Sequence, residues 1–376
     1  MSRFFDLVSK PAREMDVYSP MPASVQEARA QLIKLDSNEN PFGPSPRAIE
    51  AMRAALAGVN SYPEDDCSKL RNKLAASHDV LPEQVMVTAG STALLSLLCQ
   101  TLLGPGLNAV TSACSFIVYS LAVHASGASL IETPTTNDGI DLDAVRAAID
   151  DHTRVVFLAN PNNPTGTLLD ASALDRFLAQ VPGHVVVVLD EAYYEFAKLF
   201  AALRATPYSK SLDYVRQGAS VVVLRTFSKV HGLAGLRVGY GLGPAELLGY
   251  CARMRNTFSV SSVAQAAAAA AMDHKEYVDG VIENNAAQAQ VLMQGLSGVG
   301  YRVVPTWANF LYCDVGQDAA GVAAGLRNEG VSVRPLGPWG APNCIRVTIG
   351  TPEQNQILLE AARRVSLRDS AIGHQA

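Results

Sequence analysis

Three runs of branched aliphatic residues in this chain each end in polar residues, and this pattern restricts the fold more than any other feature. The runs lie at Val155–Ala159, Val185–Leu189 and Val221–Thr226. Runs of this length and composition are typical of strands that are covered on both faces of a sheet. In α/β sheets, ligands bind beyond the carboxyl ends of such strands. We therefore expect the polar groups that follow the three runs to share one edge of a sheet.

The segments around these strands alternate between helical and extended patterns. Helices are predicted over residues 142–149 and 171–180, and this alternation favours a mainly parallel sheet with right-handed crossovers. After residue 301, short strands alternate with helices at 319–329 and 353–364, which indicates a compact α+β unit. The expected parts are an N-terminal arm over residues 1–44 that contributes to the small domain, a large domain over 45–270 and a small C-terminal domain over 271–376.

The composition is that of a globular protein with a large core. Of 376 residues, 48% are hydrophobic and 17% charged, and the net charge is −5 without a block of Lys or Arg. This gives no indication of a nucleic acid or a membrane surface as a partner. No stretch approaches the roughly 20 apolar residues of a spanning helix, and the N-terminus lacks the apolar core of a signal peptide. We therefore expect a cytoplasmic location.

The six cysteines are scattered through apolar surroundings without a CxxC pair. This arrangement favours reduced core thiols over disulfides or a zinc site. Sequences typical of a zinc protease, a P-loop and a nucleophile elbow are also absent. We expect no metal in the site.

Lys229 follows the third strand and precedes glycine-rich turns. In a buried site, desolvation disfavours the ammonium form, and the nearby Arg237 would add repulsion. Both effects would lower the pKa of Lys229, so that its amine could act as a nucleophile near neutral pH. Taken alone, a lysine after a strand is more often a solvated loop residue.

A second candidate site lies between a predicted strand at 85–88 and an apolar helix at 93–103. Gly90, Ser91 and Thr92 occupy the turn between them. The unpaired N–H groups and the positive end of the helix dipole at such a turn bind anions. An ordinary capped helix would have the same local sequence.

Four motifs together resemble the signature set of the fold-type I, pyridoxal-phosphate-dependent aminotransferases. They are SKVHGLAGLRVG, DEAYYEF, NPNNPTG and KLDSNENPFGPSP. The resemblance covers essentially the whole chain and is greatest to the histidinol-phosphate aminotransferase branch. It implies an α/β fold with a large domain, in which a mainly parallel central sheet lies between helices, and a smaller α+β domain.

The resemblance implies a role for each strand-end group. Lys229 would condense with the aldehyde of pyridoxal 5′-phosphate and then carry a proton as general base and acid. Asp190 would keep the pyridine nitrogen protonated, while Asn163 and Tyr193 would donate hydrogen bonds to the phenolic oxygen. The groups that would hold the phosphate are Gly90, Ser91, Thr92, Ser228 and Arg237.

Two more residues are assigned to the coenzyme by the resemblance. Phe116 falls where the family stacks an aromatic ring on the pyridine, and Arg225 would support the phosphate-binding groups. Phe116 lies two residues after Cys114, which stands where the family more often has proline.

Substrate contacts are also implied. Arg346 would bind a carboxylate, and Arg334 would bind the substrate phosphate, since a planar guanidinium suits both anions. Tyr18, Phe258 and Asn163 complete the implied substrate site. Tyr62 would reach the coenzyme phosphate of a second subunit, so the resemblance implies a homodimer.

The predicted function is a ping-pong transfer between an amino donor and a 2-oxo acid, with histidinol phosphate and 2-oxoglutarate as the first hypothesis, in histidine biosynthesis. Phe116 and Phe258 stand where the branch often has tyrosines, and a pocket without these hydroxyls would also suit phenylalanine or tyrosine. The alternatives are therefore an aromatic-amino-acid aminotransferase, an amino-acid-phosphate decarboxylase and a non-catalytic coenzyme-binding protein. Residues 196–212 have no functional interpretation.

Overall fold

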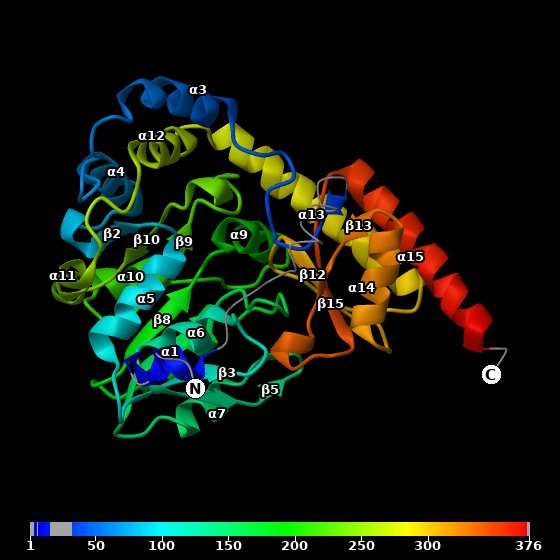
Figure 1. The fold of residues 1–376 in the computed structure, drawn as a ribbon, viewed down its shortest axis with the longest axis horizontal. Coiled ribbons are helices and arrows are strands. Elements are labelled where there is room, and N and C mark those ends of the chain that lie inside the picture. The colour runs from blue at the N-terminus through cyan, green and yellow to red at the C-terminus, as the bar shows by residue number, and fades with distance from the viewer. Residues whose placement is uncertain (1–3, 6, 16–31, 374–376) are drawn as a thin grey trace.

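The computed structural model describes residues 4–5, 7–15 and 32–373. Two lobes lie side by side, a larger one built around a green sheet and a smaller one in orange and red (Figure 1). Tyr18 lies outside the described residues.

The larger lobe is organised around a seven-stranded sheet with the order β2-β10-β9-β8-β7-β3-β4. Its strands are β2 (Val85–Thr88), β3 (Asn108–Ser112), β4 (Ser129–Thr133), β7 (Thr153–Ala159), β8 (Val186–Asp190), β9 (Val221–Thr226) and β10 (Gly239–Leu242). Neighbouring strands from β9 to β4 run parallel, while β10 is antiparallel to both β2 and β9. The prediction of a mainly parallel sheet is confirmed.

Part of the segment after Lys229 that the sequence predicted as glycine-rich turns forms strand β10 instead. Packing requires Gly239, because a Cβ there would lie 2.4 Å from the Ser91 backbone nitrogen, while a Cβ on Gly241 would lie 2.1 Å from Leu94 Cδ2 and would force that side chain to shift. The N-terminal half of helix α5 (Ser91–Leu102) therefore lies directly against this strand. That contact brings the start of α5 next to the site.

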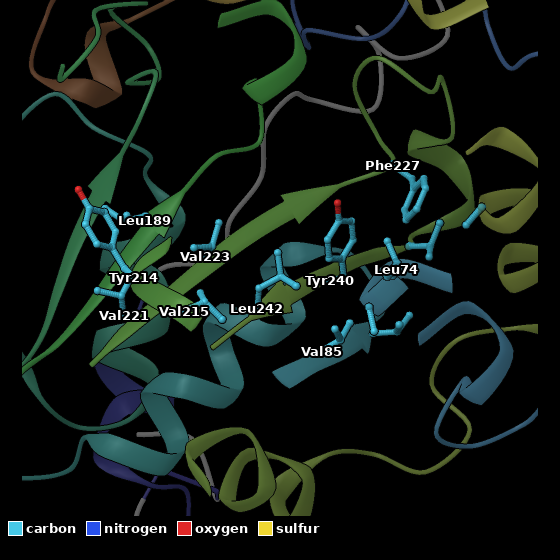
Figure 2. Close-up of a cluster of buried hydrophobic side chains, with 14 of the residues drawn as sticks. Leu74, Val85, Leu189, Tyr214, Val215, Val221, Val223, Phe227, Tyr240 and Leu242 are labelled. Carbon is cyan, nitrogen blue, oxygen red and sulfur yellow. The ribbon is translucent and has the colours of Figure 1, made fainter. Parts of the chain in front are cut away.

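Both faces of the sheet are buried, as the aliphatic composition of its strands predicts. On β9, Val221 and Val223 belong to one hydrophobic cluster, whereas Val222 and Leu224 belong to another. Because successive side chains of a strand point to opposite faces, the two clusters cover opposite sides of the sheet. Figure 2 shows the first cluster, in which Tyr214, Phe227 and Tyr240 lie among aliphatic side chains.

Helices surround the large sheet. They are α3 (Pro46–Ala55), α4 (Ser68–His78), α5, α6 (Val118–Ala125), α7 (Leu142–Ala147), α8 (Ala171–Leu178), α9 (Tyr194–Leu203), α10 (Ser211–Arg216) and α11 (Ala245–Met254). Several begin at polar side chains that accept a hydrogen bond from the first turn, such as Ser45 before α3, Asp141 before α7 and Asp170 before α8. The uninterpreted segment 196–212 forms most of α9 and the start of α10.

Two consecutive helices lead from the larger lobe to the smaller one. Helix α12 (Ser262–Ala271) packs against α3, and α13 (Lys275–Gly298) continues to the smaller lobe (Figure 1). There the sheet order is β11-β12-β15-β14, from β11 (Arg302–Val304), β12 (Phe310–Asp314), β14 (Arg334–Pro335) and β15 (Cys344–Thr348). Helices α14 (Ala319–Asn328) and α15 (Pro352–Gly373) cover this sheet.

The described part of the N-terminal arm contacts both lobes. Its short strand β1 (Ile33–Lys34) pairs in parallel with β13 (Val331–Ser332) in the smaller lobe. A five-residue helix in the arm, α1 (Lys10–Glu14), contacts α6 in the larger lobe. The remaining short elements are β5 (Thr135–Thr136), β6 (Gly139–Ile140) and the 3₁₀ turns η2 (Leu56–Gly58), η3 (Pro82–Gln84), η4 (Ala234–Leu236) and η5 (Gly337–Trp339).

Candidate active site

A cavity of about 280 Å³ lies where the carboxyl ends of β7, β8 and β9 face the smaller lobe. It is lined by eleven of the residues that the sequence singled out: Ser91, Thr92, Phe116, Asn163, Asp190, Tyr193, Ser228, Lys229, Arg237, Arg334 and Arg346. Gly90 adjoins it through Arg237. The three predicted strand ends therefore do meet at one edge of the sheet.

Lys229 lies just beyond the end of β9, with its side chain in the cavity. Its Nζ donates a hydrogen bond to the carbonyl oxygen of Ser37 at 3.2 Å. Burial lowers the pKa of Lys229 to about 7, and the charges of Arg346 and then Arg237 add to this effect against the opposing charge of Glu39. The sequence indicated Arg237 as the nearby cation, but Arg346 is the stronger one.

Asp190 is the last residue of β8 and is almost fully buried. Its Oδ2 accepts a hydrogen bond from the Tyr119 hydroxyl at 3.0 Å, and its Oδ1 accepts one from the Ala192 backbone at 3.2 Å. Burial raises the pKa of Asp190 to about 6, although these donors and the charge of Lys229 act in the opposite direction. The sequence did not reveal Tyr119, which is three residues beyond Phe116 at the start of a helix.

Arg346 connects the smaller lobe to a loop of the larger one. Its Nη1 donates to Asn163 Oδ1 at 2.6 Å and its Nη2 donates to the Asp36 carbonyl at 2.9 Å. Because the carboxamide oxygen of Asn163 faces the arginine, its NH₂ group is turned the other way. Arg334 lies directly opposite Arg346 in the pairing of β14 with β15, and its Nε donates to the same Asp36 carbonyl at 3.4 Å.

Tyr193 is held by a residue that the sequence placed in the arm motif without assigning a role. Asn38 Nδ2 donates to the Tyr193 hydroxyl oxygen at 3.0 Å. Asn38 is buried, with φ of 56°, a left-handed conformation that asparagine adopts more readily than most residues. Because the Tyr193 oxygen accepts this bond, its own proton remains available for donation to a ligand.

One corner of the cavity combines a helix N-terminus with an arginine. Gly90 caps α5, which has twelve residues, with φ of 83°. A Cβ at Gly90 would lie 2.5 Å from Arg237 Nη2, so the guanidinium approaches the start of the helix closely. Arg237 Nη1 also donates to Ser228 Oγ at 3.4 Å. Backbone N–H groups, hydroxyls and a cation thus face one small region, which is suited to a phosphate.

Besides Gly90, three predicted residues in the described part of the chain do not line the cavity. Tyr62 and Phe258 are 83% and 43% exposed and stack on each other, with ring centroids 4.7 Å apart. Arg225 is buried and pairs with Glu191 at 2.8 Å. The cavity in turn contains residues that the sequence did not assign a role: Ser37, Asn38, Glu39, Ile117, Thr226 and Trp339.

The described residues offer neither a metal site nor a membrane-spanning helix. No group of three or more His, Cys, Asp or Glu side chains within residues 4–5, 7–15 and 32–373 is placed to hold a metal ion. In the same part of the chain, no helix has the length and apolarity needed to cross a bilayer.

Comparison with known proteins identifies the family. The family described as Aminotransferase class I and II matches residues 30–361. Histidinol-phosphate aminotransferase 2 of Pseudomonas fluorescens (strain Pf0-1) is 45% identical over 361 residues, which are 96% of this chain and 93% of that protein. The protein of the same name from Pseudomonas aeruginosa is 42% identical over 375 residues, 98% of this chain and all of the relative.

A solved structure agrees with the sequence comparisons. Histidinol-phosphate aminotransferase from Sinorhizobium meliloti, determined in complex with pyridoxal-5′-phosphate, superposes with a TM-score of 0.88 and 26% identity. The superposition covers 97% of this chain and 98% of that one. Family match, sequence identity and fold all agree, and the chain belongs to the class I and II aminotransferases, which depend on pyridoxal phosphate.

Proposed function

We propose that this enzyme transfers the amino group of histidinol phosphate to 2-oxoglutarate by a ping-pong reaction. The observation that carries the proposal is the pair Arg334 and Arg346, which lie opposite each other on β14 and β15 and both line the cavity. Two cations suit a phosphorylated donor in one half-reaction and a dicarboxylate in the other. The relatives named histidinol-phosphate aminotransferase support the same substrate.

The residues of the cavity fit pyridoxal phosphate. The coenzyme needs an anion site, an acceptor for its protonated ring nitrogen, donors for its phenolic oxygen and an amine for its aldehyde. The start of α5, together with Arg237 and Ser228, would hold the phosphate. The Arg237 guanidinium approaches the start of this helix so closely that a Cβ at Gly90 would lie 2.5 Å from its Nη2. Asp190 would accept from the ring nitrogen. Tyr193 and Asn163 would then face the phenolic oxygen with their available hydrogens.

When bound, the coenzyme supplies an electron sink for the pair released as the substrate Cα–H bond breaks. Lys229 Nζ would take the proton from Cα and return it at the coenzyme's C4′, as general base and then acid. Its pKa of about 7 before coenzyme binds means that much of the amine is unprotonated at neutral pH. Arg346 would exchange its bond to Asn163 for the anion of the substrate, which fixes the orientation of Cα.

An experiment on Arg334 tests the substrate assignment. In Arg334→Ala, kcat/KM should fall by about 100-fold with histidinol phosphate and less with glutamate, because a phosphate gains more from a guanidinium than a carboxylate does. Arg364→Ala, which removes an exposed arginine of α15, should change neither value. Equal losses with both substrates would remove the phosphate role from Arg334.

An aromatic-amino-acid aminotransferase is the second candidate. Phe116 and Trp339 both line the cavity and would accommodate a benzyl side chain as well as an imidazole. A substrate panel read by the change in coenzyme absorbance separates the two. Transfer from phenylalanine without transfer from histidinol phosphate would select the aromatic function. Carbon dioxide release without consumption of a 2-oxo acid would select a decarboxylase, and no reaction with any amine would select a coenzyme-binding protein.

We further propose a homodimer in which Tyr62 reaches the neighbouring active site. The proposal is supported by the exposure of Tyr62 and of Phe258 on which it stacks, and by their absence from the cavity of their own chain. Mixing Lys229→Ala with Tyr62→Ala subunits tests it, because each hybrid dimer would contain one site with both residues intact. Activity well above that of either variant is expected, and its absence would place Tyr62 outside the neighbouring site.

We also propose a cytoplasmic location. All six cysteines are free in the structure, and none is exposed. Unpaired thiols are typical of proteins in a reducing compartment. Cell fractionation with an antibody to the protein tests this proposal.

A further inference from the structure

Tyr119 is a buried tyrosine next to the site that the reaction described above does not use. It lies in α6, is 1% exposed and ranks among the largest fully buried side chains. Its ring stacks on Phe157 at 4.8 Å with an interplanar angle of 8° and meets the edge of Phe116 at 5.5 Å. Its hydroxyl donates to Asp190 Oδ2 at 3.0 Å. Tyr119 therefore contacts two residues that line the cavity, the Phe116 ring and the Asp190 carboxylate.

We propose that Tyr119 is a positioning residue that strengthens coenzyme binding through Asp190, by holding the Asp190 carboxylate ionised and aimed at the pyridine nitrogen. This inference depends on the proposed contact between Asp190 and that nitrogen. Tyr119 itself does not line the cavity, so its effect has to pass through Asp190.

The need for such a residue follows from the surroundings of Asp190. A carboxylate that is only 6% exposed loses most of its hydration, and the neighbouring Glu191 adds repulsion. Lys229 is the attractive charge, but with its pKa lowered to about 7 its amine is only partly charged at neutral pH, and it is consumed when the coenzyme condenses with it. Two donors then remain for the carboxylate, the Tyr119 hydroxyl and the Ala192 backbone. Charge-assisted bonds of this kind are about twice as strong as neutral ones.

The two donors also fix the plane of the carboxylate. Each oxygen of Asp190 accepts one hydrogen bond from the protein, Oδ2 from Tyr119 and Oδ1 from Ala192. A carboxylate has about four lone-pair positions, so further positions remain for the ring nitrogen. Burial raises the pKa of Tyr119 well above its ordinary value, so the phenol keeps its proton and acts as a donor near neutral pH.

Packing alone does not explain a tyrosine here. Phenylalanine would make the same stack on Phe157 and the same edge contact with Phe116. Burying a hydroxyl is unfavourable unless it is hydrogen-bonded, and its acceptor in this structure is Asp190. The hydroxyl is therefore explained by what it does to the carboxylate.

The test compares the binding of two coenzymes to coenzyme-free protein. Pyridoxal phosphate carries the ring nitrogen, whereas its 1-deaza analogue has carbon at that position and cannot use Asp190. In Tyr119→Phe, the dissociation constant of pyridoxal phosphate should rise about tenfold. That of the 1-deaza analogue should change less than about twofold. Both constants are measured by absorbance after reconstitution.

Tyr214→Phe is the matched control. Tyr214 is also a buried tyrosine whose hydroxyl donates to an aspartate, Asp175 at 2.6 Å, but neither residue lines the cavity. Its removal should leave both dissociation constants unchanged. Thermal unfolding of the coenzyme-free variants shows that each is folded. If Tyr119→Phe does not fold, Tyr119→His, which keeps a ring N–H donor, is expected to bind pyridoxal phosphate more tightly than the 1-deaza analogue.

The outcomes separate this inference from the function on which it depends. If wild-type protein binds both coenzymes equally, Asp190 does not bind the ring nitrogen and the proposed role of Asp190 fails. If wild-type protein distinguishes them but Tyr119→Phe weakens both equally, Tyr119 is only structural and the inference is overturned. An unchanged constant for pyridoxal phosphate in Tyr119→Phe, or the same rise in Tyr214→Phe, overturns it as well.

Discussion

Strand β9 and the turn after it carry two cations, the buried Arg225 and the partly buried Lys229, whose surroundings shift their pKa values in opposite directions. Arg225 donates two hydrogen bonds to Glu191 Oε2, at 2.8 and 3.1 Å, and its guanidinium lies 3.5 Å from the centre of the Tyr194 ring. Burial is the largest single influence and acts to lower the pKa of Arg225, but the charges of Glu191, Tyr240, Tyr194 and Glu195 together outweigh it and raise the pKa. Arg225 is thus kept charged.

Lys229 receives no comparable partner. Its Nζ donates to a backbone carbonyl, and its strongest charged neighbour is another cation, Arg346. The pKa of Lys229 falls to about 7 for these reasons. The comparison teaches that burial by itself does not decide whether a cation is structural or reactive. The deciding feature is whether a carboxylate lies within hydrogen-bonding distance.

The largest effect is expected at the reactive member of the pair. Lys229→Ala removes both the amine that holds the coenzyme and the proton carrier, so turnover should fall by about 10⁴-fold or more. The absorbance band that a wild-type enzyme shows after incubation with pyridoxal phosphate should also be lost. Transamination at the wild-type rate would contradict the assignment of Lys229.

At Arg225, we expect the effect on the free energy of unfolding. Glu191→Gln leaves Arg225 buried without its hydrogen-bonded carboxylate, and we expect the free energy of unfolding to fall by about 3 kcal/mol. Urea unfolding of the coenzyme-free protein measures it. A change below about 0.5 kcal/mol would show that Ser209 and Ser211, which donate to Glu191 in the native structure, can reorganise around Arg225.

A third prediction concerns pH. The folded pKa of Lys229, about 7, lies below its ordinary value of 10.5, so the unfolded chain binds more protons between these limits. Lys229 therefore destabilises the coenzyme-free protein fully below pH 7, and the cost disappears as pH rises to 10.5. Lys229→Met should stabilise by on the order of 2 kcal/mol at pH 7 and much less at pH 10. A gain that is independent of pH would indicate improved packing instead.

The smallest effect is expected for an exposed pair. Lys275 and Asp279 lie one turn apart in α13 at 2.8 Å, with side chains 83% and 41% exposed. Asp279→Asn removes the same kind of contact as Glu191→Gln, but water hydrates both charges in either state. The urea midpoint should not shift measurably. A shift as large as that of Glu191→Gln would mean that burial is not what makes the inner pair costly to break.

The strands that carry the site could be predicted because runs of branched aliphatic residues are typical of strands buried on both faces. The predicted limits Val85–Thr88 and Val221–Thr226 coincide with β2 and β9. Strand β10 could not be predicted, because its glycines are needed for the close approach of α5 rather than for a turn. Helix α1 and strand β1 of the arm could not be predicted either, because they contact α6 and β13, which are distant in sequence. The domain boundaries stay a prediction.

The residues of the site divide in the same way. Lys229, Asp190, Asn163 and Arg237 follow strands or lie in recognisable motifs, and the structure brings them to one cavity. Asn38 and Tyr119 could not be assigned, because their partners Tyr193 and Asp190 are 155 and 71 residues away in sequence. Tyr62 and Phe258 lie outside the cavity of this chain, so no single subunit tests their proposed roles.

The two arginines Arg334 and Arg346 belong to the smaller sheet, whereas Asp190 ends a strand of the larger sheet and Lys229 lies just beyond another. During evolution, substitutions on β14, β15 and the adjacent η5 turn could alter which compounds are accepted without disturbing the groups that carry out bond breaking. The groups proposed to recognise the substrate anion and the groups proposed to break bonds thus lie in two separate lobes.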